Sequence, residues 1–346
     1  MNRILKLMIT CVFALGAWLP SMTGAAFAAS APTEEWTKYP LIAHALGGID
    51  GVDYTNSLEA FKTNYDKGQR VFEVDLSLTQ DGQLAARHDW EGYLATKFEQ
   101  NIPADQLNEP LTLKEFKGYK ILKDYTPLSF MNVVRILEKY PDVYFITDTK
   151  ETDPALVQKQ FTLIKDTVNK VDPALLDRLI PEIYSPEMMT QVKNLVPFKH
   201  VIFSIYMSSM EPNEVAKYVK ENQIHVVAMP FERATRSYMK KLSDAGAVVY
   251  VHSLNNVDDV NKYLAMGVHG VYTDFLSYKD LGIDTTAWTQ PVTVASAAPA
   301  NPAASNTEAA ATPASSTAVS GNAVAAEPKP SAWEMLKSIL SDIFSI

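Results

Sequence analysis

Three acidic residues lie within or at the end of apolar runs in this sequence. Glu73 and Asp75 alternate within the run Val71–Leu78, so both side chains point to one face of a strand, and Asp148 closes a later run. Two like charges this close need a cation, a shared proton or open water. Carboxylate oxygens are the ligands that Mg²⁺ and Ca²⁺ prefer, so the three acids predict a site for one divalent cation.

Two histidines close other apolar runs and could transfer protons at the same site. His44 ends the first run and His88 ends the third. An imidazole can act as general base toward an attacking water or hydroxyl, or as general acid toward a departing alcohol. His252 closes a late run and is a further candidate to line the site, whereas His225 opens its run and is expected to serve the fold.

Strand-like and helix-like stretches alternate through about 250 residues. Short runs rich in Val, Ile and Tyr predict strands at 41–44, 71–78, 83–88, 143–148, 179–183, 200–205, 225–229, 247–252 and 270–273. Amphipathic stretches predict helices at 57–65, 129–140, 154–168, 186–195, 212–221, 232–245 and 257–266. This alternation predicts an α/β fold, a closed (β/α)8 or TIM barrel over residues 36–284, whose active site lies at the carboxyl ends of the strands.

Two local patterns refine this fold. Asp81-Gly82 precedes the run 83–88 and is typical of a hairpin turn. The sequence contains no glycine-rich phosphate loop of the kind found in nucleotide-binding open sheets, which favours the closed barrel.

The two ends of the chain differ from the barrel. Arg3, Lys6 and the apolar stretch that follows them, closed by Ala26-Phe27-Ala28, predict a signal peptide over residues 1–28. Residues 285–330 are rich in Ala, Pro, Ser and Thr and predict a disordered linker. Residues 331–346 have apolar side chains at helical spacing and predict a short amphipathic helix, which either contacts a membrane or the cell envelope or packs back on the barrel.

Charge and cysteine content exclude several classes of function. The formal net charge is −9, and removal of 1–28, which holds two basic and no acidic residues, makes it −11. A nucleic-acid partner is therefore not expected, because phosphate binding requires clustered Lys and Arg. The single cysteine, Cys11, lies within the predicted signal peptide, so a metal in the mature protein would be bound by oxygen and imidazole. The expected location is extracellular or attached to the cell envelope.

A series of short motifs occurs in order between about residues 41 and 278. The motifs are His44, Tyr54-Thr55-Asn56-Ser57, Glu73-Val74-Asp75, Thr79-Gln80-Asp81-Gly82, His88-Asp89, Asp148-Thr149-Lys150 and Gly267-Val268-His269-Gly270-Val271-Tyr272-Thr273-Asp274. The series resembles that of the glycerophosphodiester phosphodiesterases, a family of the phospholipase C-like TIM-barrel superfamily.

The resemblance implies a metal-dependent phosphoric diester hydrolase of lipid metabolism. Its substrates would be glycerophosphodiesters, cleaved to an alcohol and a phosphomonoester with the help of one Mg²⁺ or Ca²⁺. The site residues it implies are the metal ligands Glu73, Asp75 and Asp148, the catalytic histidines His44 and His88, and the phosphate-binding residues Lys150 and Asn56, with Asn56 also helping to position the site.

Four departures from the family pattern bear on specificity. Ala45 replaces an arginine, Tyr54-Thr55 replaces Pro-Glu, Asp148 replaces a glutamate and His252 stands where many members have a tryptophan. The Asp-x-Lys motif also resembles the sphingomyelinase D and phospholipase D-like branch of the superfamily. Two alternatives therefore stay open at this point: an enzyme acting on intact phospholipids through their head groups, and a catalytically silent barrel that binds phosphate esters.

Overall fold

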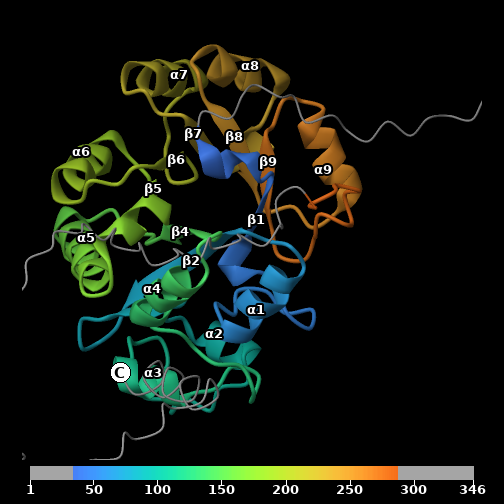
Figure 1. Cartoon of the computed structure of the whole chain (residues 1–346). Helices are drawn as coiled ribbons and strands as arrows, with labels where there is room; N and C mark the ends of the chain where they lie inside the picture. The colour runs from blue at the N-terminus through green and yellow to red at the C-terminus, as the bar shows by residue number, and fades with distance from the viewer. Residues whose placement is uncertain (1–33, 287–346) are drawn as a thin grey trace, which may run out of the picture.

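A closed barrel of eight parallel strands forms the centre of the molecule (Figure 1). The computed structural model describes residues 34–286. Pairing of β1 with both β2 and β9 closes the sheet. The barrel strands are β1 (Leu41–Ala43), β2 (Val71–Leu78), β4 (Tyr144–Asp148), β5 (Leu179–Ile183), β6 (Ile202–Ser204), β7 (Val226–Pro230), β8 (Val248–His252) and β9 (Gly270–Thr273).

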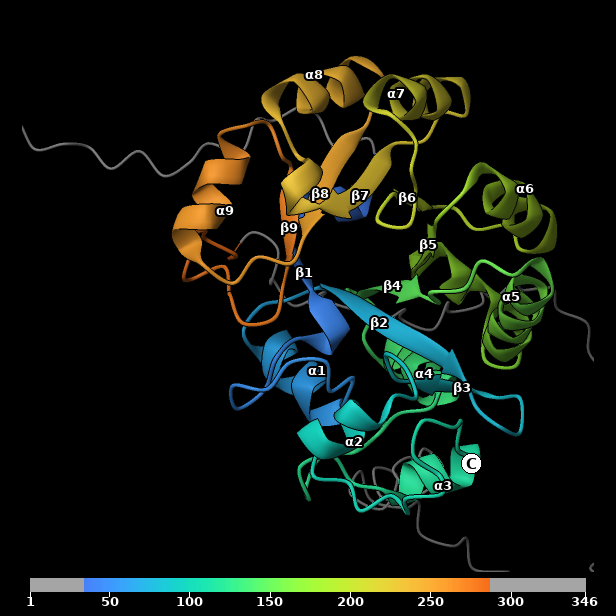
Figure 2. The ribbon, with the colours of Figure 1, turned by 180° about the vertical axis from the view of Figure 1, so that it is seen from behind.

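Helices surround the barrel in the order that the sequence predicts (Figures 1 and 2). They are α1 (Leu58–Asp66), α4 (Phe130–Lys139), α5 (Pro154–Asn169), α6 (Pro186–Leu195), α7 (Pro212–Glu221), α8 (Arg236–Asp244) and α9 (Val257–Leu264). N-cap side chains define where several of these helices begin. Ser129 caps α4 in a reciprocal arrangement with Asn132, and Asp153 accepts two backbone N–H bonds at the start of α5. Each such cap contributes about 1 kcal/mol.

An insertion between β2 and α4 extends one side of the barrel. The strand β3 (Leu84–Ala86) pairs antiparallel with the end of β2, as the Asp81-Gly82 turn predicts. The helices α2 (Gly92–Lys97) and α3 (Leu113–Gly118) follow, and both views place them on the side of α1 and α4 (Figures 1 and 2). This insertion brings the segment after β3, which includes His88, to the barrel.

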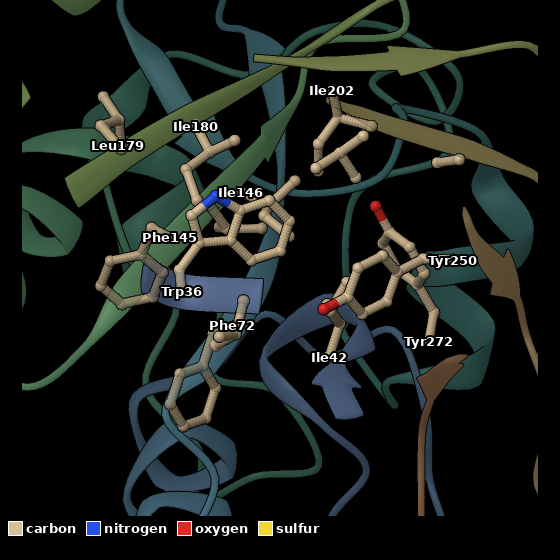
Figure 3. Close-up of a cluster of buried hydrophobic side chains, with 14 of the residues drawn as sticks. Trp36, Ile42, Phe72, Phe145, Ile146, Leu179, Ile180, Ile202, Tyr250 and Tyr272 are labelled. Carbon is tan, nitrogen blue, oxygen red and sulfur yellow. The ribbon is translucent and has the colours of Figure 1, made fainter. Parts of the chain in front are cut away.

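The amino-terminal end of the barrel is filled by apolar side chains. The 3₁₀ helix η1 (Glu35–Lys38) carries the fully buried Trp36, whose ring stacks on Tyr250 with centroids 5.5 Å apart. The Tyr250 hydroxyl donates to the backbone oxygen of Tyr39 at 2.8 Å, which ties this segment to β8. Figure 3 shows Trp36 within the same buried cluster as Ile42, Ile146, Ile180, Ile202 and Tyr250.

The predicted fold is confirmed within the described residues, and three predictions lie outside them. The signal peptide over 1–28, most of the linker over 285–330 and the amphipathic helix over 331–346 remain predictions. Among residues 34–286, no helix combines the length and the apolar content that crossing a bilayer requires.

Candidate active site

The barrel interior changes from apolar to polar toward the carboxyl ends of its strands. Successive inward-facing residues lie two apart, and on five of the strands an apolar side chain is followed by a polar one. The pairs are Ile42 and His44, Ile146 and Asp148, Ile180 and Glu182, Ile202 and Ser204, and Tyr250 and His252. A cavity of about 270 Å³ opens above this layer, and five of the predicted site residues line it: His44, Glu73, His88, Asp148 and Lys150.

The three predicted metal ligands meet at one place. Asp75 and Asp148 are register partners on the neighbouring strands β2 and β4. One oxygen from each of Glu73, Asp75 and Asp148 lies within 4.8 Å of the others, and all three residues are buried. Glu73 Oε2 accepts the backbone N–H of Ala45 at 2.6 Å, whereas its buried Oε1 has no hydrogen-bond partner within residues 34–286. A buried oxygen without a partner beside two other carboxylates fits a hard divalent cation.

Lys150 balances part of this negative charge. Its ammonium forms ion pairs with Asp75 and Asp148. Burial alone would raise the pKa of Asp75, but the charges of Lys150 and of nearby histidines outweigh it and lower that pKa to about 2. Burial and the charge of Asp75 raise the pKa of Glu73 well above its usual value. Lys150 is one-quarter exposed and lines the cavity, where a phosphate could reach its ammonium. The contact with a phosphate stays a prediction.

Asn56 holds the carboxylate of Asp75 in place. Its side-chain amide donates to Asp75 Oδ2 at 2.7 Å, and its side-chain oxygen accepts the backbone N–H of Asp75 at 3.1 Å. The residue is fully buried and does not line the cavity. Both ends of its amide are occupied by Asp75, and these contacts orient that carboxylate. The predicted contact of Asn56 with a phosphate stays a prediction.

His44 is fixed by an acid that directly follows the last strand. Its Nδ1 lies 2.9 Å from Asp274 Oδ1, and its Nε2 lies 4.0 Å from Glu73 Oε2. Burial disfavours the imidazolium, but the hydrogen bond to Asp274 and the charge of Glu73 outweigh burial and raise the pKa of His44 to about 9. Gly48 lets the Asp274 backbone come close to the segment that follows His44. The Gly48 N–H donates to the Asp274 backbone oxygen, and a Cβ on residue 48 would lie 2.9 Å from that oxygen.

His88 has a similar arrangement on the other side of the cavity. Its Nδ1 lies 2.6 Å from Asp89 Oδ2, and the Tyr93 hydroxyl donates to the same oxygen at 3.1 Å. In each histidine a carboxylate binds Nδ1, which leaves Nε2 as the nitrogen that can exchange a proton with a substrate. Both imidazoles line the one cavity.

Tyr54 lies between the two imidazoles. Its ring centroid is 4.9 Å from that of His44 and 5.0 Å from that of His88, in edge contacts with interplanar angles of 79° and 90°. Lys97 packs over the Tyr54 ring at 5.0 Å and pairs with Asp53. The phenol ring therefore sets the spacing of the two candidate proton carriers.

Several residues of this site are missing from the sequence-based prediction. Asp274 and Asp89 occur in the quoted motifs, but sequence alone does not show that each one binds a histidine. Glu182 interrupts the apolar run 179–183, a signal comparable to Glu73, and it lines the cavity. Tyr184 follows that run, and its hydroxyl donates to Asp148 while accepting the backbone N–H of Lys150 at 3.1 Å.

Comparison with known proteins identifies the family. The model of the glycerophosphoryl diester phosphodiesterase family matches residues 43–277, which include every residue of the cavity described above. This chain belongs to that family. It is a phosphoric diester hydrolase built on a TIM barrel.

Individual relatives are distant in sequence but similar in fold. A glycerophosphodiester phosphodiesterase of Bacillus subtilis is 21% identical over 284 residues, which cover 79% of this chain and 95% of that protein. A candidate glycerophosphoryl diester phosphodiesterase of Silicibacter pomeroyi has a TM-score of 0.58 at 16% identity, covering 70% of this chain and 94% of its own. A phosphodiesterase of Oleispira antarctica, solved with the product sn-glycerol-3-phosphate, has a TM-score of 0.56 at 15% identity and covers 68% and 93%.

Proposed function

We propose that this protein hydrolyses glycerophosphodiesters to an alcohol and a phosphomonoester with one bound divalent cation, Mg²⁺ or Ca²⁺. The observation that carries the proposal is the meeting of three carboxylates, within 4.8 Å of one another, with two carboxylate-bound imidazoles at one cavity. A cation held by Glu73, Asp75 and Asp148 would supply Lewis-acid stabilisation of charge on a phosphate oxygen.

The protein's own residues supply the remaining chemistry. The Lys150 ammonium faces the cavity and adds a fixed positive charge for the phosphate. His44 and His88 divide the two proton transfers, one from the attacking water or substrate hydroxyl and one to the departing alcohol. Their carboxylate partners, Asp274 and Asp89, hold each ring so that Nε2 can exchange the proton.

The size of the cavity supports a small substrate. A space of about 270 Å³ accommodates a phosphate together with a short alcohol, and the Oleispira antarctica relative holds sn-glycerol-3-phosphate. Activity on deacylated glycerophosphodiesters should therefore exceed activity on sphingomyelin or lysophospholipid micelles. The reverse order of rates would favour the phospholipase alternative.

We also propose that the protein is exported, on the sequence of residues 1–28, and that residues 331–346 provide a peripheral contact with the envelope. Cleavage after Ala28 would be seen as a mature amino terminus at Ala29 in the secreted fraction. Deletion of 331–346 should reduce retention on liposomes or cell envelopes. Unchanged retention would contradict the envelope contact.

Alanine substitution of each histidine tests the proposed function. His44→Ala and His88→Ala should each lower kcat on glycerophosphodiesters by about 10²–10⁴-fold, the usual contribution of a general acid or base. His225→Gln serves as control, because His225 precedes β7 at the opposite end of the barrel. EDTA should abolish turnover, and added Mg²⁺ or Ca²⁺ should restore it. Wild-type rates in both alanine variants, or turnover that EDTA does not affect, would refute the proposal.

A further inference from the structure

A second polar surface of the cavity comes from strands other than β2 and β4, which carry the three carboxylates. It consists of Glu182 on β5, Tyr206 after β6, His252 at the end of β8 and Tyr272 on β9, all of which line the cavity. The rings of Tyr206 and Tyr272 each contact the His252 ring edge-on, with centroids 5.8 Å apart in both cases. We call Tyr206 and His252 the hydroxyl–imidazole pair.

The two residues of this pair have buried polar atoms without partners. Within the part of the chain that the structure describes, neither the Tyr206 hydroxyl nor His252 Nε2 has a hydrogen-bond partner. Their neighbours differ in this respect, because the Tyr272 hydroxyl donates to Glu182 Oε1 at 2.6 Å. A buried polar group left unsatisfied costs about 1–3 kcal/mol, so two such groups side by side at a cavity indicate that a ligand completes them.

The protonation states of the pair favour an uncharged ligand group. Burial, together with the nearby charge of His44, lowers the pKa of His252 to about 4, so its ring is neutral at physiological pH. Burial raises the pKa of the Tyr206 hydroxyl, which therefore remains a donor. A neutral imidazole offers one acceptor and one donor, and a phenol offers a donor. An alcohol hydroxyl, which both donates and accepts, matches this set.

The pair is connected to the carboxylates through Tyr184. Tyr206 contacts the ring of Tyr184, with centroids 5.4 Å apart, and the Tyr184 hydroxyl donates to the metal ligand Asp148. A continuous row of rings therefore runs from the carboxylates to the hydroxyl–imidazole pair. A substrate with its phosphate at the carboxylates would place its glycerol group against this row.

We propose that Tyr206 and His252 determine substrate specificity by hydrogen bonding to hydroxyl groups on the glycerol portion of the diester. This inference rests on the proposed function. Glu182 is a positioning residue, since its bond to Tyr272 fixes the ring that packs on His252. Sites built to bind a substrate hydroxyl strongly reject the analogue that lacks it, because the protein groups are then left unpaired.

The test compares two diesters that differ only in hydroxyl groups. One is sn-glycero-3-phosphoethanolamine and the other is its analogue with 2-hydroxypropyl in place of glycerol, which keeps the hydroxyl next to the phosphate and lacks the terminal one. In both cases the released ethanolamine is measured. The wild-type protein should prefer the glycerol diester by about 10–100-fold in kcat/KM, the effect of one or two hydrogen bonds. Tyr206→Phe and His252→Phe should each reduce that preference at least about threefold, chiefly by slowing the glycerol diester.

Two further variants separate recognition from structure. His252→Gln restores a hydrogen-bonding group and should recover part of the preference that His252→Phe loses. Tyr218→Phe, on α7 outside the cavity, should leave the preference unchanged. Thermal unfolding of each variant shows that the comparison is made on folded protein.

The outcomes distinguish this inference from the proposed function. Turnover of both diesters at similar rates by the wild-type protein, or an equal loss on both in the variants, would overturn the assignment while leaving the phosphodiesterase function in place. Absence of turnover on both diesters and on bis(p-nitrophenyl) phosphate would overturn the proposed function and this inference together.

Discussion

Replacement of Lys150 by methionine tests how charge is balanced at the carboxylates. Met keeps the aliphatic length of the side chain and removes its charge. Lys150 pairs with Asp75, which is fully buried, and with Asp148, which is 9% exposed. Removing one partner of a buried ion pair costs about 3–5 kcal/mol, because it leaves uncompensated charge.

This cost converts to a measurable shift in melting temperature. For a domain of about 250 residues, 1 kcal/mol changes Tm by about 2–4 °C. The Tm of Lys150→Met in EDTA should therefore be about 6–20 °C below that of the wild-type protein. Saturating Mg²⁺ or Ca²⁺ should narrow the difference, because a cation at the same carboxylates replaces the missing positive charge, and binding at 100 times Kd stabilises by about 2.7 kcal/mol.

Calorimetry or circular dichroism of the two proteins in EDTA, in Mg²⁺ and in Ca²⁺ gives the six Tm values required. Lys159→Met is the matched control, since Lys159 is an exposed lysine on α5 and its replacement should change stability by no more than about 0.5 kcal/mol. Equal Tm values for Lys150→Met and wild type in EDTA would refute the charge-balance argument. A difference that neither cation narrows would show that the cation does not bind at these carboxylates.

Three further predictions follow from the site. Burial lowers the pKa of His252 to about 4, whereas His252 in the unfolded chain takes up a proton near pH 6.5, so the free energy of unfolding should fall as the pH drops below 6.5. At pH 5 this loss amounts to about 2 kcal/mol. Urea unfolding should therefore show that His252→Gln loses about 2 kcal/mol less stability than wild type between pH 7.5 and 5, and equal losses would contradict the shift. Asp274→Asn should lower kcat by about 10²-fold with little change in KM, because the acid fixes and charges His44; steady-state kinetics showing an unchanged kcat would exclude that role. Tyr54→Phe should keep most of the activity and Tyr54→Ala should not, because the ring spaces the two imidazoles; equal rates in the two variants would remove the spacing role.

The barrel and the meeting of the three acids could be predicted because their signals are local. Apolar runs and helical periodicity define the strands and helices, and the period of two places Glu73 and Asp75 on one face of a strand. Asp148 ends the neighbouring parallel strand, so strand order alone brings it beside Asp75. The Asp81-Gly82 turn likewise predicts the antiparallel β3.

The partners of these residues could not be predicted because they depend on closure of the barrel. Asp274 lies 230 residues after His44 and reaches it only because β9 pairs with β1. Lys150 could be expected to face a phosphate, but its pairing with two carboxylates depends on side-chain geometry that spacing does not specify. Spacing likewise does not specify that Asn56 binds Asp75 with both ends of its amide.

The position of the bound cation tests the central claim most directly. Crystals of the protein soaked in Mn²⁺, which scatters anomalously and substitutes for Mg²⁺ at oxygen ligands, would locate it. The account predicts one anomalous peak in the cavity, with an oxygen of Glu73, Asp75 and Asp148 each at about 2.0–2.6 Å and the Lys150 ammonium displaced toward the cavity. A cation bound elsewhere, or no peak at these carboxylates at saturating Mn²⁺, would contradict it.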